Sequence, residues 1–488
     1  MLRLAILPAL LLLSFAARAG EFYYEMSAPA VAAYERILRL ELQGAQADID
    51  RLRARQPANL VTHHLESYLD FFRLYLSGSE RLRPELEARF DRRIAALEEG
   101  DESSPWYRYA LAEARLHQSL IHLRFERQLA AFRELNRAHK LLRDNAEEFP
   151  DFALTYKDLG LVHAAVGSIP SQYKWGVEVI SSLTGTIAEG RAELLRARNA
   201  GASPFGLETE VLSSFLELHL AGNPEAAYRR INDLGLDPAA NALHAFVLAN
   251  MAMRSGRNDR ALSVLDKQPR GGAVADFPYL DFMLGLAKLR RLDPTARIHF
   301  QSFLVRYAGR HFKEEARQKI AWSYLLEGDE AGYLSTLDAI GGDSKAGGDQ
   351  NAAREAARAR LPHPALLRAR LLFDGNYCEK ARKELNGVDV NSLSADERLE
   401  YYYRTGRVLE GLTDYPGALS FYQQTIDRGA DNPAFYACKA ALQAGLVEEQ
   451  RGNKAAAQAY FERCLDLDPA EYRHGLHLLA KAGLNRVR

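Results

Sequence analysis

Cysteine is scarce in this 488-residue chain: only Cys378, Cys438 and Cys464 are present, all in its last quarter. An odd number of thiols cannot pair completely, and a chain of this length can fold on its hydrophobic core without a disulfide framework. We therefore interpret the three thiols as small apolar residues at helix contacts. The alternative is an approach of Cys438 to Cys464 across one helical hairpin.

An excess of one charge is also lacking. The chain has 63 Lys and Arg residues against 64 Asp and Glu residues, which gives a formal net charge of -1, and both signs are mixed throughout. Proteins that bind nucleic acid through bulk electrostatics carry a basic surplus. The composition therefore predicts no nucleic-acid partner.

Long apolar runs are missing except near residue 1. Arg3 is followed by an apolar run from Leu4 to Phe15 and then by Ala17-Arg18-Ala19, a small-x-small site typical of signal peptidase cleavage. The run is shorter than the roughly 20 residues that a spanning helix needs. We expect a signal peptide over residues 1–19, cleaved after Ala19, and export to the periplasm or cell envelope. No cysteine for lipid attachment follows it.

Motifs of catalysis and of metal binding are absent as well. Gly185 and Gly190 have the spacing of a phosphate-binding loop, but the Lys and Ser/Thr that contact phosphate and magnesium are missing. No Gly-x-Ser-x-Gly occurs, and none of the 13 histidines stands in a His-Glu-x-x-His pattern. We predict no catalytic residue, no metal, no cofactor, and a protein that is not an enzyme.

The sequence does contain a helical repeat. Residues 399–433 and 434–469 each have an aromatic or apolar helix, a turn and a second helix that begins near a small residue. Aligning the two segments pairs Gly406 with Gly445, Ala418 with Ala457 and Tyr422 with Phe461. Weaker copies extend upstream to about residue 205. No stretch alternates with period two, so no sheet is expected.

These residues resemble the tetratricopeptide repeat, in which small residues let two helices approach closely while large residues fill the gaps. The resemblance implies an all-α fold, a tetratricopeptide-like helical solenoid of stacked antiparallel helix pairs. Beyond the signal peptide we expect an N-terminal helical region (20–150), a helical repeat with a glycine-bearing hairpin (151–200), tetratricopeptide-like repeats (201–470) and a capping helix (471–488). Residues 266–278 and 338–353 are expected to be loops.

The glycine-bearing hairpin has the most distinctive sequence, IPSQYKWGVEVISSLTGTIAEGRAELLRA, residues 169–197. Pro170 is suited to start a first helix and Gly185 to end it, and a second helix with Gly190 and Leu194 follows. Together with Leu159-Gly160, this segment resembles the tetratricopeptide repeat protein 39 family and its fungal inclusion-body-clearance relatives. The family has no established catalytic residues to transfer.

An amphipathic helix around Trp175 at a membrane surface is a rival interpretation of the hairpin. Lys174 and Glu178 give this helix almost no cationic face, so membrane contact is not favoured.

The leading functional hypothesis is a non-catalytic scaffold or adaptor that binds a peptide or protein in the groove of the solenoid. The alignment of the C-terminal repeats predicts that the groove is lined by Tyr403, Arg407, Lys439, Leu442 and Leu446. Tyr403 and Arg407 occupy the first two positions of the Lys/Asn clamp that chaperone-binding repeats use, which excludes that subclass. The alternatives are a structural subunit of an envelope assembly and a repeat protein associated with the membrane surface.

Overall fold

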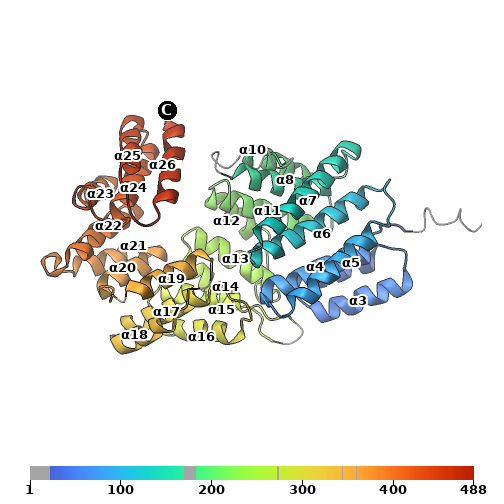
Figure 1. Cartoon of the computed structure of the whole chain (residues 1–488), viewed down its shortest axis with the longest axis horizontal. Helices are drawn as coiled ribbons and strands as arrows, with labels where there is room; N and C mark the ends of the chain where they lie inside the picture. The colour runs from blue at the N-terminus through green and yellow to red at the C-terminus, as the bar shows by residue number, and fades with distance from the viewer. Residues whose placement is uncertain (1–21, 170–182, 272–273, 343, 359, 488) are drawn as a thin grey trace, which may run out of the picture. The chain divides into compact units, whose positions relative to one another are not determined.

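The computed structural model describes residues 22–169, 183–271, 274–342, 344–358 and 360–487. Within these ranges the regular structure is helical, and the extended backbone is limited to one isolated bridge between Tyr23 and Asn59. The expected all-α helical solenoid is confirmed. Consecutive helices pack against each other as antiparallel pairs (Figure 1).

The chain divides into two compact units. The first contains residues up to 255 together with 263–280 and 305–311, and the second contains 256–262, 281–304 and 312–488. Three helices have residues in both units: α14 (Asn258–Leu265), α15 (Tyr279–Leu289) and α16 (Ala296–Arg306).

The other helices of the first unit are α2 (Ala28–Leu38), α3 (Leu42–Arg55), α4 (Val61–Ser77), α5 (Arg83–Leu97), α6 (Pro105–Arg124), α7 (Gln128–Glu148), α8 (Leu154–Gly167), α10 (Ile187–Arg198), α11 (Gly206–His219), α12 (Pro224–Asp233) and α13 (Ala242–Arg254).

The second unit continues with α17 (Lys313–Leu326), α18 (Glu330–Asp338), α19 (Gly347–Arg358), α20 (Pro364–Asp374), α21 (Cys378–Asn386), the 3-10 turn Val390–Ser392, α22 (Ala395–Gly411), α23 (Tyr415–Gly429), α24 (Tyr436–Gln450), α25 (Lys454–Asp466) and α26 (Arg473–Val487).

One contact recurs in the two C-terminal helix pairs, and it explains why their repeat can be recognised in the sequence. A methyl group added to Gly406 of α22 would lie 2.7 Å from the Tyr422 ring of α23. The equivalent group at Gly445 of α24 would lie 2.6 Å from Phe461 of α25. Glycine on the first helix therefore makes room for an aromatic ring on the second, and the two glycines and the two rings are the residues that the repeat alignment pairs.

The hairpin expected at residues 169–197 is described in part. Most of its predicted first helix, from Pro170 to Gly185 and including Trp175, lies in residues 170–182, which are outside the described residues. The second helix is α10, and it packs on α8 so closely that a methyl group at Gly190 would lie 2.2 Å from the Gly160 carbonyl oxygen. Glycine at this position is thus required by the close approach of two backbones.

The prediction of a loop at residues 338–353 is wrong for its second half, because helix α19 begins at Gly347. Asp349 in its first turn is 1% exposed, and its carboxylate accepts hydrogen bonds from the backbone N–H groups of Phe312 (2.8 Å) and Glu315 (2.9 Å). It thereby satisfies N–H groups at the start of α17 that no helical carbonyl can reach. Glycine and aspartate, which usually indicate a loop, here start a helix and cap its neighbour.

The C-terminal helix α26 packs on α24 and α25, and Leu476, Ala480 and Leu484 are buried in the same core. The predicted signal peptide lies outside the described residues. Among the helices that are described, none combines the length and the apolarity needed to cross a membrane.

Candidate functional site: a charged groove in the second unit

The second unit contains a groove with a volume of about 920 Å³. Its walls come mainly from α17, α19, α20, α22 and α24, with short connecting segments at 360–363, 432–435 and 470–472. The basic side chains that line it are Arg290, Lys319, Arg354, Arg358, Arg360, Arg370, Arg404, Arg407 and Lys439. The aromatic ones are Trp322, Phe373, Tyr403, Phe435, Tyr436 and Tyr472.

Several of these basic groups are neutralised by acidic residues of the groove itself. Arg360 pairs with Asp396 at 2.9 Å, and Arg358 pairs with Glu471. Arg404 of α22 donates to Glu400 one turn earlier, at 2.6 Å. These pairs give the groove alternating charge instead of a continuous cationic track.

Lys439 and Arg370 are among the basic groups that are not neutralised in this way. Within the described part of the chain, neither Lys439 nor Arg370 forms an ion pair. The Arg370 guanidinium lies 4.7 Å from the Trp322 ring centroid. Burial, followed by the nearby Arg407, lowers the pKa of Lys439 below its ordinary value. A positive charge that is partly desolvated and close to another positive charge is stabilised by an anion that enters the groove.

Lys319 adds to this positive potential from α17. Its ammonium lies 3.8 Å from the Trp322 ring centroid, and burial lowers its pKa to about 8. Trp322 thus has cations near its ring from both α17 and α20. Aromatic faces attract such cations through their quadrupole.

The structure brings three of the five predicted groove residues together. Tyr403, Arg407 and Lys439 line the groove. Leu442 is fully buried in the C-terminal core and Leu446 packs against the same core, so these two lie away from the groove lining. The reason is that α24 is surrounded by α22, α23, α25 and α26, which leaves only its first turn facing the groove.

Helix α19 also contributes to the groove, which was not predicted from the sequence. Asn351, Arg354, Glu355 and Arg358 all line the groove from this helix. Glu355 also accepts hydrogen bonds from Trp322 Nε1 (2.6 Å) and from Gln318 (2.6 Å), which fixes α19 to α17. The available signal was the segment from 350 to 360, rich in Ala and Arg, which has high helix propensity.

A second group of charged side chains lies in the core of the first unit. The Lys157 ammonium is fully buried and contacts Glu113 (2.5 Å), Asp158 (3.3 Å) and Glu208 (3.0 Å). The hydroxyl of Tyr68 donates to Glu113 at 2.5 Å. We call Lys157, Glu113, Asp158 and Glu208 the buried ion cluster. Because Lys157 has no exposed surface, the cluster holds helices together and offers no access to a ligand.

The fold defines an all-α protein built from stacked antiparallel helix pairs. Neither a protein-family model nor a curated protein sequence matches the chain. Among solved structures, a human IFIT1 dimer with m7Gppp-AAAA is similar at 14% identity and a TM-score of 0.37, covering 91% of this chain and 90% of that chain.

The tetratricopeptide repeat domain of P58(IPK) is similar at 13% identity and a TM-score of 0.22, covering 85% of this chain and 96% of that chain. At these values no ligand can be transferred from either structure.

Proposed function

We propose that the protein is a non-catalytic binding scaffold whose second unit receives a peptide segment bearing carboxylates. The observation that carries the proposal is the groove of about 920 Å³ with Lys439 and Arg370 unpaired in it and aromatic rings around them. A carboxylate placed beside these two groups would gain charge-assisted hydrogen bonds, each worth about 1.5–3 kcal/mol. The aromatic rings would contact the apolar parts of the same peptide.

A peptide fits this groove better than a nucleic acid does. A nucleic-acid backbone needs a row of free cations, whereas here Arg358, Arg360 and Arg404 are already paired with acidic residues. A single peptide carboxylate needs only a local unpaired cation such as Lys439, whereas successive phosphates would meet cations that are already paired. The acidic groups of the groove could also accept hydrogen bonds from peptide N–H groups and from basic side chains. Absence of nucleic-acid binding remains a prediction, and so does absence of catalysis.

Export belongs to the same proposal. A scaffold carrying the predicted signal peptide would meet its partner in the cell envelope. A signal-peptide fusion to a reporter, compared with one that lacks residues 1–19, tests this part separately.

We also propose that this chain is related to the tetratricopeptide repeat protein 39 family. It is supported by Leu159-Gly160 and Gly190, since the two glycines form the contact between α8 and α10. An experimental structure that showed no helix before Gly185 would remove the resemblance.

The groove is tested by panning a random peptide library on the immobilised full chain and measuring the selected peptides by fluorescence polarisation. We expect peptides rich in Asp and Glu, and we expect Lys439→Gln to weaken their binding about tenfold, as loss of one charged hydrogen bond implies. Lys454→Gln is the matched control, because Lys454 is exposed at the start of α25.

Equal binding by wild type, Lys439→Gln and Lys454→Gln would refute the groove assignment. A labelled oligonucleotide is titrated in parallel. If it binds and the acidic peptides do not, the peptide proposal is wrong.

A further inference from the structure

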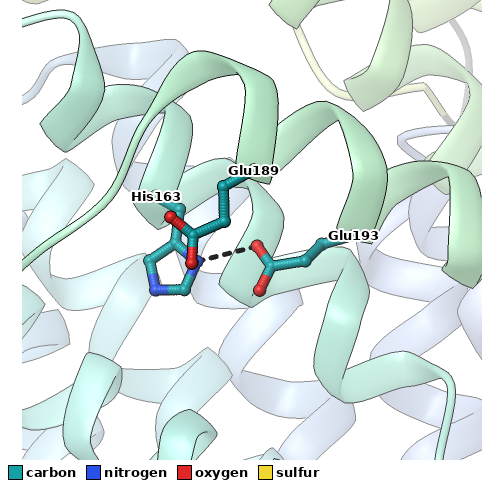
Figure 2. Close-up of side chains that lie close together, drawn as sticks. All are labelled: His163, Glu189 and Glu193. Carbon is teal, nitrogen blue, oxygen red and sulfur yellow. Dashed lines mark hydrogen bonds and ion pairs between the residues drawn. The ribbon is translucent and has the colours of Figure 1, made fainter.

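Three side chains with metal-binding atoms converge where α8 and α10 pack together (Figure 2). His163 comes from α8, and Glu189 and Glu193 come from α10. The Nδ1 atom of His163 lies 2.8 Å from a carboxylate oxygen of Glu193 and 3.6 Å from one of Glu189. One donor atom from each residue lies within 4.8 Å of the other two. Glu189 and Glu193 are four residues apart on a helix, so their side chains leave it on the same face.

The backbone holds these residues in place. Gly160 and Gly190 bring the axes of α8 and α10 so close that a methyl group at either position would overlap the other helix. The Thr186 hydroxyl accepts a hydrogen bond from the backbone N–H of Glu189 at 3.0 Å, which fixes the first turn of α10. The donor atoms therefore belong to two rigid helices and not to a loop, as a preorganised site requires.

The charges around the three residues are unbalanced. Within the described residues, neither Glu189 nor Glu193 forms an ion pair with lysine or arginine, and their only basic neighbour at ion-pair distance is His163. Elsewhere in the first unit carboxylates commonly have an arginine partner, as Glu217 has in Arg191 at 2.7 Å. Two neighbouring carboxylates beside an imidazole thus favour a cation between them.

The other nitrogen of His163 supports the same conclusion. Its Nε2 lies 3.2 Å from Nε2 of His139, which is 1% exposed on α7. If the Nδ1 lone pair of His163 binds a cation, the ring proton resides on Nε2 and is donated to His139. Histidine ligands of metals usually donate their second N–H to a buried partner in this way, which fixes the tautomer and the ring orientation.

We propose that His163, Glu189 and Glu193 bind a divalent transition-metal ion, with Zn²⁺ the best match to one imidazole and two carboxylates. Three protein ligands leave one coordination position for water or for a small anionic ligand. The Glu189 side chain is 50% exposed, so an ion can enter from solvent without unfolding the helices. This site is in the first unit and is independent of the groove proposed for peptide binding.

Sequence patterns did not reveal this site, because His163 and Glu189 are separated by the segment 164–188. The two glutamates alone resemble an ordinary solvated helix face. The packing of α8 on α10 brings the His163 imidazole to the two glutamates.

The test is isothermal titration of ZnCl₂ into untagged, chelator-treated full-length protein. We expect the wild type to bind one Zn²⁺ at this site. Glu189→Gln and Glu193→Gln should each weaken Zn²⁺ binding at least about 100-fold. Losing a residue that only supports a ligand costs up to about 100-fold, and these two residues are proposed as ligands themselves. Glu189→Gln is the more informative variant, since a half-exposed side chain can change without loss of the fold.

Glu147→Gln on α7 is the matched control, because it removes the same charge from an exposed position of the same unit. The visible absorption of bound Co²⁺ provides a second readout, and it should be lost in both site variants. The proposal is overturned if the wild type binds no Zn²⁺, or if the two site variants bind it as tightly as Glu147→Gln does. Unchanged circular dichroism of each variant in metal-free buffer shows that the fold is intact.

Discussion

Replacing Lys157 with methionine should destabilise the first unit strongly. The substitution keeps an unbranched side chain of similar length up to Cε and removes the ammonium that contacts Glu113, Asp158 and Glu208. Although burial alone would raise the pKa of Glu113, Lys157 and His64 hold it well below its ordinary value. Glu113 therefore stays ionised in the folded protein and depends on these two partners.

The size of the destabilisation follows from the Glu113 carboxylate, which stays buried after Lys157 is removed. The Glu113 side chain is only 3% exposed, so its charge would remain out of water with His64 and two tyrosine hydroxyls as partners. Breaking a buried ion pair by removing one member costs about 3–5 kcal/mol. Burial raises the pKa of Asp158, which is therefore less dependent on Lys157. We expect a loss of about 3–5 kcal/mol in the free energy of unfolding.

Urea unfolding followed by far-ultraviolet circular dichroism measures this loss, with the transition of the first unit fitted separately from that of the second. Lys140→Met is the control, because Lys140 is exposed on α7. The double variant Lys157→Met/Glu113→Gln should be more stable than the sum of the single effects predicts, because it no longer buries the unpaired Glu113 carboxylate. A change below about 1 kcal/mol in Lys157→Met, equal to that in Lys140→Met, would refute the reasoning.

Three further outcomes are expected. Burial lowers the pKa of His117 to about 3, so this residue destabilises the fold as the pH falls below its unfolded value of about 6.5. His117→Asn should therefore gain about 2 kcal/mol relative to wild type between pH 7 and pH 5, and an unchanged difference in urea unfolding would contradict this. Gly190→Ala should cost about 1–3 kcal/mol, because its methyl group meets the backbone of α8, whereas Gly206→Ala meets nothing within 4 Å and should be neutral or slightly stabilising. Equal stability of the two glycine variants would show that α8 and α10 do not approach so closely. All three cysteines are free and buried, so Ellman's reagent should titrate none in the folded protein and three after unfolding. One reactive thiol after unfolding would mean that Cys438 and Cys464 had paired.

The sequence predicted those parts of the fold that depend on near neighbours. Gly406 and Tyr422 are 16 residues apart, and Gly445 and Phe461 are also 16 apart, so the contact between paired helices leaves a periodic signal. For the same reason Tyr403, Arg407 and Lys439, at the equivalent face of successive first helices, could be selected as groove residues.

The remaining features depend on partners that are distant in sequence. The ion pair between Lys157 and Glu113 spans 44 residues, and the one between Lys157 and Glu208 spans 51. The adjacent Lys157 and Asp158 within a mainly apolar helix α8 are a faint sign of buried charge, but they do not identify Glu113 or Glu208 as partners. Helix α19 was missed for a different reason, since Asp349 resembles a loop residue until its role in capping α17 is visible.

The buried ion cluster also has a consequence for the order in which the chain folds. Its members lie on α6, α8 and α11, and Glu208 additionally accepts a hydrogen bond at 2.5 Å from the Tyr34 hydroxyl, 174 residues earlier. During synthesis, which starts at the N-terminus, Tyr34 cannot contact Glu208 until residue 208 has been added. Contacts between residues so distant in sequence also slow folding. Until then Lys157 lacks one of its carboxylates. Nascent chains shorter than about 200 residues, which lack Glu208, should therefore stay loosely folded in this region.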